Sequence, residues 1–423
     1  MNLIIVLVDT LRADHLHYHG YPRDTSPRID QFAANSQVFL SHQASSSRTG
    51  PSVASIFTGL FPRSHGVINP LTSFDAKGVL NKDQTTMAEI LSAQGYECFG
   101  YTANLNASGR FGFAQGFREY QLLITGSATD IRRRAVKVLG ESRDRPFFLY
   151  LHFMEPHSPY HAPAGYDSLF VDPEYGGLIT GRHRQLDKIV VGKLKVDDAD
   201  VAQMEALYDQ EIRYMDDEFG FLVDFLAEQG LGDNTLVVFI ADHGEEFLEH
   251  GSALHGYTLY QEQLHVPFII HDPSRPTGQR LDSVTRHVDV LPTLLEMLHI
   301  NYDQSGQGQS LVPLLDGRDS GEEEVDVLAE VSLMAIKTVR QRSLTVGDWK
   351  LIEGIIPKET VELYDLRQDP GEQQNLAAID SAKTEELRTR LADLLASLPA
   401  AKGTTTILSE KEIQKLRSLG YVR

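Results

Sequence analysis

Short apolar runs of four to eight residues, each bordered by polar residues, constrain this chain of 423 residues most strongly. The clearest runs cover residues 3–8, 146–152 and 235–240, and residues 266–271 form a further candidate. Runs of this length without polar alternation are typical of strands that are buried on both faces of a parallel sheet.

Segments with helical periodicity lie between these runs. The spacing of apolar residues predicts helices over 85–94, 198–229 and 290–298, with Pro292 near the first turn of the last one. Strands that alternate with helices predict an α/β fold, in which helices cover both faces of a large parallel or mixed sheet.

Acidic residues follow two of the predicted strands. Asp9 comes directly after the run 3–8, and Asp242 comes just after the run 235–240. Because ligands of such sheets gather at the carboxyl ends of the strands, we expect these two carboxylates to meet at one edge of the sheet. The sequence therefore places the candidate functional site there.

The remaining segments are less regular. Residues 158–200 mix Pro, Gly and charge and are predicted to form a surface insertion beside the site, and residues 303–326 are expected to form a linker or loop. A strand over 343–352 and an amphipathic helix over 384–398 are predicted after that linker. We therefore expect a catalytic domain at residues 1–325 and a C-terminal subdomain at residues 326–423.

Composition narrows the classes of partner. The net charge of −20 argues against a nucleic-acid partner, so an anionic substrate needs a local positive site. No apolar stretch approaches transmembrane length, and the run 3–8 lacks the charged flank of a signal peptide, which predicts a cytoplasmic protein without a membrane partner. Cys98 is the sole cysteine, so an intrachain disulfide is excluded. Self-association is left open.

Five segments carry a family resemblance. Residues 4–9, 49–67, 152–160, 242–269 and 363–376 resemble, in this order, successive signature blocks of the sulfatase family, within the alkaline phosphatase superfamily. The resemblance spans nearly the whole chain. It implies an alkaline-phosphatase-like sheet sandwiched by helices, a small C-terminal α+β subdomain with an antiparallel sheet, and a metal-dependent hydrolase of small anionic esters.

The resemblance also implies one divalent metal ion, bound by Asp9, Asp242, His243 and the hydroxyl of Thr49. His243 stands where sulfatases have Asn, and Thr10 stands where many of them have a second Asp. This shift from oxygen towards nitrogen ligands favours Zn²⁺ or Mn²⁺ over Ca²⁺.

A second metal ion is not expected but is left open. Glu155 is one candidate ligand, although a structural role is favoured for it, and His287 with Asp289 is another.

Thr49 constrains the chemistry. Sulfatases carry Cys or Ser at this position, converted to formylglycine, and Arg four residues later; here those positions hold Thr49 and Val53. Oxidising a secondary alcohol gives a ketone, so formylglycine cannot form. A sulfated threonine lacks the elimination route of the hydrated aldehyde, whereas a phosphorylated threonine can be cleaved by water at phosphorus. The sequence thus favours phosphate or phosphonate mono- or diesters.

Three alternatives remain open. The chain could be a sulfuric ester hydrolase, a phosphoethanolamine-type transferase that acts without formylglycine, or a degenerate sulfatase-like binding protein.

The other site residues follow from the same blocks. The resemblance suggests His157 as a donor to anion oxygens and His255 as the general acid, because His255 stands where sulfatases usually have Lys. The expected substrate-binding residues are Asn69, Arg48, Asn104 and Thr102. His152 is assigned to the core, and His250 to a structural role.

Overall fold

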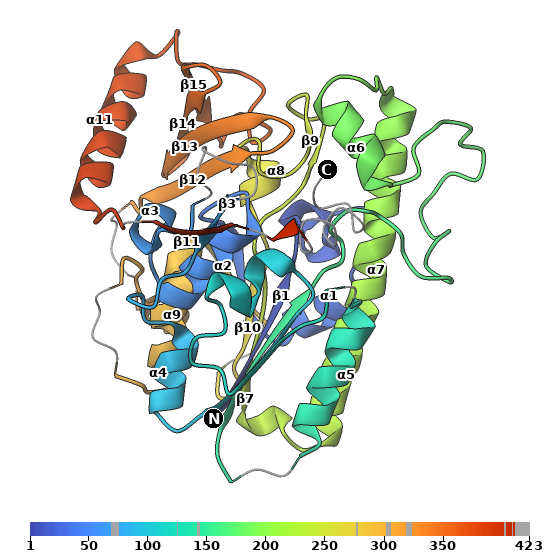
Figure 1. Ribbon diagram of the computed structural model, residues 1–423, viewed down its shortest axis with the longest axis vertical. Coiled ribbons are helices and arrows are strands. Elements are labelled where there is room, and N and C mark those ends of the chain that lie inside the picture. The colour runs from blue at the N-terminus through green and yellow to red at the C-terminus, as the bar shows by residue number, and fades with distance from the viewer. Residues whose placement is uncertain are drawn as a thin grey trace.

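The computed structural model describes residues 1–68, 76–124, 126–141, 144–275, 278–301, 306–318, 324–401, 403–407 and 409–410. An eight-stranded mixed sheet lies between two layers of helices, and a four-stranded antiparallel sheet sits at one end of it (Figure 1). The α/β fold with a small C-terminal antiparallel sheet is therefore confirmed.

The central strands of the large sheet are parallel. The strand order is β11 (Gln279–Arg286), β2 (Gln37–Gln43), β10 (Phe268–His271), β7 (Thr235–Ala241), β1 (Asn2–Val8), β6 (Phe147–Phe153), β4 (Glu97–Thr102) and β5 (Glu119–Leu122). Every residue of β1 is buried. The register pairs Val8 of β1 with Phe153 of β6 and with Ala241 of β7, so these three strands end side by side.

Strand β10 differs from the expectation for residues 266–271. It pairs antiparallel with both β7 and β2, whereas a parallel strand was predicted. The chain that leaves β7 carries two short strands, β8 (Glu246–Phe247) and β9 (Ala253–Leu254), and the short helix α8 (Gln261–Leu264). It contains no long crossover helix of the kind that usually joins parallel strands, and it returns the chain in the opposite direction.

Alternate residues of β1 face different helix layers. Ile4, Val6 and Val8 belong to the core that includes α1 (Pro27–Ala33), α5 (Ala128–Leu139) and α7 (Asp198–Glu228). Leu3, Ile5 and Leu7 belong to the core that includes α2 (Thr49–Thr58), α4 (Met87–Ala93) and α9 (His287–Met297). Figure 1 shows the two layers on opposite sides of the sheet. Burial on both faces explains why the run 3–8 has no polar alternation.

The C-terminal sheet contains β12 (Val327–Met334), β13 (Thr338–Val346), β14 (Trp349–Ile356) and β15 (Thr360–Asp365), and α11 (Ser381–Ser397) packs against it. The single strand predicted over 343–352 is wrong, because the chain reverses between β13 and β14. Gly347 has a φ of +54° at this turn, a conformation that glycine adopts without a Cβ clash.

Several smaller expectations also changed. The insertion 158–200 contains a helix, α6 (His183–Val190), whose Leu186 and Ile189 are buried. Helix α9 begins at His287, so Pro292 lies inside the helix rather than near its first turn. Of residues 303–326 the structure describes 306–318 and 324–326, which include α10 (Val312–Leu315). In the described part of the chain, no helix is both long and apolar enough to cross a membrane.

The remaining described elements are short. They are α3 (Pro62–His65), β3 (Ala76–Val79), β16 (Thr404–Ile407) and the 3-10 helices Ala13–His15, His17–His19, Leu105–Ala107, Gly109–Phe111 and Gly232–Asn234.

Candidate active site

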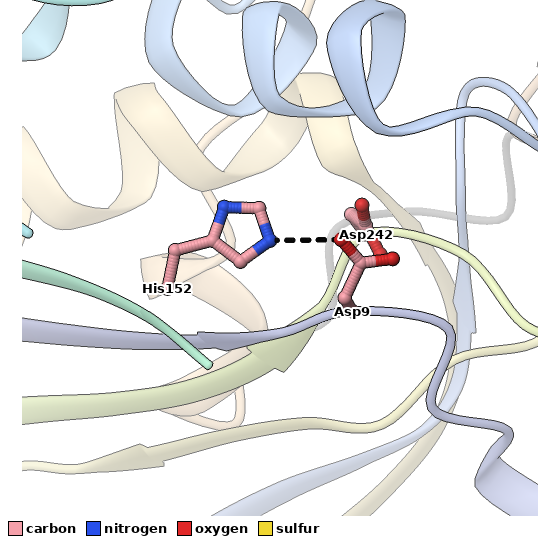
Figure 2. A group of neighbouring side chains, drawn as sticks. All are labelled: Asp9, His152 and Asp242. Atoms are coloured by element: carbon pink, nitrogen blue, oxygen red, sulfur yellow. Dashed lines mark hydrogen bonds and ion pairs between the residues drawn. The ribbon is translucent and has the colours of Figure 1, made fainter. Parts of the chain in front are cut away.

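Three side chains converge where β1, β6 and β7 end (Figure 2). Asp9 follows β1, His152 lies near the end of β6, and Asp242 follows β7. All three are fully buried. His152 Nε2 lies 3.2 Å from Asp9 Oδ2, and one ligand atom from each residue falls within a cluster 4.8 Å across. The register of the three strands thus brings residues together that are distant in sequence.

Thr49 is the first residue of α2 and lies against this cluster. Asn104 Nδ2 donates a hydrogen bond to Thr49 Oγ1 at 3.2 Å and also donates to Asp9 Oδ2. Thr49 Oγ1 is 3.4 Å from His243 Nε2. A hydroxyl at the N-terminus of a helix of 10 residues is exposed to the positive end of the helix dipole, which stabilises an alkoxide or a bound anion.

Among the described residues, two carboxylate oxygens in the cluster lack a hydrogen bond. Within the described residues, Asp9 Oδ1 and Asp242 Oδ2 are buried without a hydrogen bond. His243 Nε2 lies 3.9 Å from the first and 3.5 Å from the second. Buried unpaired oxygens are costly, and a divalent cation would satisfy both. Asp9, Asp242, His243 and Thr49 therefore form a donor set that fits such an ion.

The second oxygen of Asp242 is fixed by the backbone. Oδ1 accepts hydrogen bonds from the N–H of Thr10 at 3.2 Å and of His243 at 2.8 Å. Thr10 has a φ of +54°, which is strained for a β-branched residue, and this conformation accompanies the hydrogen bond to Asp242. The backbone therefore holds Oδ1 of Asp242, while Oδ2 faces His243.

Burial and neighbouring charges shift the pKa values of Asp9 and Asp242 in opposite directions. Burial opposes ionisation of Asp9, but the hydrogen bond from His152 and the nearby His157 outweigh it and lower the pKa of Asp9. Burial and the charge of Asp9 raise the pKa of Asp242 well above its usual range. Burial also lowers the pKa of His243, which keeps this imidazole in the neutral form that binds metals.

Cationic and imidazole groups surround the cluster. The His255 ring lies 4.5 Å from the His243 ring and 4.9 Å from the His157 ring, measured between centroids. Arg48 runs past Gly256, where an added Cβ would lie 3.0 Å from Arg48 Cδ. The sequence-predicted residues Arg48, His157 and His255 are therefore brought to one side of the site.

Three other residues considered in the sequence analysis are Thr102, Asn69 and His152. Thr102 Oγ1 donates to the Asn104 carbonyl at 3.2 Å and accepts from the Asn104 N–H at 3.1 Å. Both bonds hold the turn that carries Asn104, and the expected contact of Thr102 with substrate stays a prediction. Asn69 lies outside the described residues. His152 is buried in β6 as expected, but it also contacts Asp9 through Nε2, which its position inside an apolar run concealed.

The groups considered for a second metal ion are engaged elsewhere. His287 accepts from the Ser45 N–H through Nδ1, and its Nε2 lies 3.1 Å from the Ala241 carbonyl. Both oxygens of Asp289 pair with the Arg286 guanidinium. Glu155 accepts the N–H of Ala128 at the start of α5, which supports a structural role.

Sequence reasoning missed three residues beside the site. Glu245 Oε1 lies 2.9 Å from His255 Nδ1, and Tyr160 O–H donates to Glu245 Oε2 at 3.0 Å. His183 of α6 lies 2.8 Å from Ser158 Oγ through Nδ1. Glu245 was visible beside the candidate ligands Asp242 and His243, but nothing in the sequence indicated that its side chain would face His255.

The chain is similar to known proteins along most of its length. Residues 1–300 match the sulfatase family model, and residues 249–401 match the model of the C-terminal region of N-sulphoglucosamine sulphohydrolase. A multifunctional alkaline phosphatase superfamily protein, PehA, of Trinickia caryophylli is 26% identical, over 75% of this chain and 78% of its own length. An arylsulfatase of Clostridium perfringens is 24% identical, over 75% of this chain and 79% of its own length.

Solved structures share the fold. A putative sulfatase from Bacteroides thetaiotaomicron superposes with a TM-score of 0.79 at 20% identity, covering 95% of this chain and 94% of its own. The phosphonate monoester hydrolase of Agrobacterium radiobacter superposes with a TM-score of 0.75 at 20% identity, covering 97% and 98%. Because the family model spans most of the chain and the catalytic fold is shared, the chain belongs to the sulfatase family of the alkaline phosphatase superfamily.

Proposed function

We propose that this sulfatase-family hydrolase cleaves phosphate or phosphonate esters through a covalent intermediate on Thr49. The observation that carries the proposal is the Thr49 hydroxyl at the start of α2, 3.4 Å from His243 Nε2 and bonded by Asn104. It lies beside two buried acids whose free oxygens suit a divalent cation.

Threonine favours phosphorus over sulfur for a chemical reason. A sulfated threonine has no elimination route and must be attacked at sulfur, whereas a phosphorylated threonine is open to attack by water at phosphorus. One similar structure supports this choice of ester, because it is a phosphonate monoester hydrolase.

The side chains divide the work as follows. A divalent ion bound by Asp9, Asp242 and His243 would supply positive charge that lowers the pKa of the Thr49 hydroxyl. Asn104 donates to Thr49 Oγ1 and so favours the alkoxide as it attacks phosphorus.

Arg48, His157 and His255 act in the remaining steps, which are charge stabilisation, protonation of the leaving group and hydrolysis of the intermediate. Arg48 and His157 stabilise negative charge on the non-bridging oxygens of the phosphoryl group. His255 gives a proton to the leaving alcohol oxygen as its bond to phosphorus breaks. Water then gives a proton to His255 and attacks phosphorus, the bond to Thr49 Oγ1 breaks, and Thr49 leaves as the alkoxide from which the next cycle starts.

A side-by-side assay tests the proposal. The purified protein is supplied in turn with Zn²⁺ and Mn²⁺, and turnover is measured with aryl esters of phosphate, phosphodiester, phosphonate and sulfate. We expect one of the three phosphorus esters to be cleaved with the highest kcat/KM. Faster turnover of the sulfate ester would contradict the proposal and favour the sulfuric ester hydrolase instead.

A further inference from the structure

Glu245 is a buried carboxylate to which the proposed reaction assigns no role. Its side chain is 0% exposed, and both of its oxygens are engaged. Oε1 lies 2.9 Å from His255 Nδ1, and Oε2 accepts the Tyr160 O–H at 3.0 Å. The three side chains form a hydrogen-bonded chain that ends at His255.

The backbone of Glu245 is also fixed. Its N–H donates to the Glu262 carbonyl at 3.1 Å, and its carbonyl accepts from Arg12 Nη1 at 3.1 Å. Tyr160 is held at its own backbone, where its N–H donates to the Gly181 carbonyl at 3.0 Å. Its ring lies 6.0 Å from the Phe247 ring. The carboxylate is therefore attached to a rigid frame, and it cannot follow a change in the orientation of His255.

We propose that Glu245, itself held by Tyr160, is a positioning residue for His255. An imidazole that donates a hydrogen bond from Nδ1–H to a carboxylate has its tautomer and its ring orientation set by that bond. The same carboxylate stabilises the doubly protonated imidazolium, whose Nε2–H, at the opposite end of the ring, is then the group that meets the leaving oxygen of the ester. This inference rests on the proposed role of His255 as leaving-group acid.

The position of Tyr160 has a second consequence. Tyr160 lies in the insertion 158–200, and α6 of that insertion packs against β9, next to His255. The insertion thereby contributes to the orientation of the acid. An insertion that folds incorrectly would disturb His255 even though the metal-binding residues stay in place.

Four variants separate positioning from general structural support. Glu245→Ala removes the acceptor, Glu245→Gln keeps an oxygen that can accept from Nδ1–H, and Tyr160→Phe removes one hydroxyl. Glu246→Gln is the matched control, because Glu246 is also fully buried but bonds the Ser252 N–H and Thr258 rather than His255.

The first measurement is kcat/KM for aryl phosphorus esters whose leaving phenols span a range of pKa. A general acid matters most for poor leaving groups and typically contributes about 10²- to 10⁴-fold. We expect Glu245→Ala to lose roughly 10²-fold on the poorest leaving group and little on the best. We expect Glu245→Gln to recover most of the loss, Tyr160→Phe to lie between the two, and Glu246→Gln to keep the wild-type dependence. Equal losses for all leaving groups, or no rescue by Gln, would overturn the proposal.

The second measurement does not depend on turnover. Nitrogen-15 NMR of histidine-labelled protein, with His255 assigned through a His255→Asn variant, reports which ring nitrogen carries the proton. We expect the proton on Nδ1 in the wild type and in Glu246→Gln, and its loss from Nδ1 in Glu245→Ala. A wild type that cleaves no ester but shows this tautomer would refute the proposed function and retain the positioning role. A His255 signal unchanged by Glu245→Ala would refute the positioning role even if the ester is cleaved.

Discussion

At the scale of single residues, the proposed chemistry depends on Thr49. Thr49→Ala removes the hydroxyl that is 3.2 Å from Asn104 Nδ2 and leaves Asp9, Asp242 and His243 unchanged. We expect turnover to fall by at least about 10³-fold, because loss of a nucleophile usually costs this much or more. We expect the content of bound metal, measured by mass spectrometry of the purified protein, to stay mostly intact.

Two further variants define the limits of this prediction. Thr49→Ser keeps a hydroxyl and should keep measurable turnover of the same ester. Ser52→Ala, in the same helix, removes only a hydrogen bond to the Ser46 carbonyl and should leave kcat within a few-fold of the wild type. Near-wild-type activity in Thr49→Ala would eliminate the covalent step.

Single residues also show where sequence reasoning stops. Asp9, Asp242 and His243 could be proposed as ligands because each follows a strand or lies in a recognisable block. The contacts of Glu245 and Thr102 could not, because they depend on which way a side chain turns after a strand has ended. His152 lies in an apolar strand, and only the register between β1 and β6 shows that its Nε2 reaches Asp9.

At the scale of elements, His250 anchors the segment between β8 and β9 through two hydrogen bonds and a ring stack. His250 Nδ1 is 2.8 Å from Glu262 Oε1, its Nε2 is 3.1 Å from the Glu372 carbonyl, and its ring stacks on Tyr260 at 3.5 Å between centroids. Burial opposes the charge, but the hydrogen bond to Glu262 and the charge of Glu262 outweigh it and raise the pKa of His250 to about 9.

A pH-dependent contribution to stability follows from that shift. A histidine whose pKa is higher in the folded state stabilises the fold fully below its unfolded pKa of about 6.5, and this contribution is lost as the pH rises through about 9. His250→Phe keeps an aromatic ring against Tyr260 but removes the charge. We expect the difference in unfolding free energy between wild type and His250→Phe to be larger at pH 6 than at pH 10, as measured by urea unfolding. A difference that grows with pH would show that the charge does not stabilise this segment.

Strands were predicted best where burial on both faces makes the whole run of residues apolar. The runs at β1, β6 and β7 were found because strands buried on both faces must be apolar throughout. The turn between β13 and β14 was missed, since its hairpin signal is only Gly347-Asp348 between two apolar segments. The direction of β10 was also missed, because the sequence of a buried strand does not record whether its neighbours run parallel or antiparallel.

At the scale of the whole molecule, the order of the five family blocks predicted the fold, while the connection between the two sheets came only from the structure. The boundary at residues 325 and 326 stays a prediction. Strand β12 lies just beyond it, and Ala329 and Val331 of that strand pack in the core of the large sheet, whereas Leu328 packs in the C-terminal core. The C-terminal sheet is therefore joined to the catalytic fold by continuous packing.

A buried ion pair of the C-terminal part lies at the junction with the catalytic fold. Lys350 Nζ of β14 lies 2.7 Å from Glu372 Oε1, and both side chains are 0% exposed. The other oxygen of Glu372 accepts the N–H of Gln261 at the start of α8, which follows the segment that carries His255. Because breaking a buried pair leaves an uncompensated charge, we expect Lys350→Met to lower the unfolding free energy by roughly 3–5 kcal/mol.

The double variant Lys350→Met/Glu372→Gln tests whether the charge or the packing is responsible. Gln keeps an acceptor for the Gln261 N–H and removes the charge that Lys350→Met leaves unpaired. We expect the double variant to be more stable than Lys350→Met alone, with a coupling on the order of 0.5–3 kcal/mol in a double-mutant cycle measured by chemical unfolding. Strictly additive losses would mean that the two side chains act independently, and the ion pair would then not account for the attachment of the C-terminal sheet to the active-site segment.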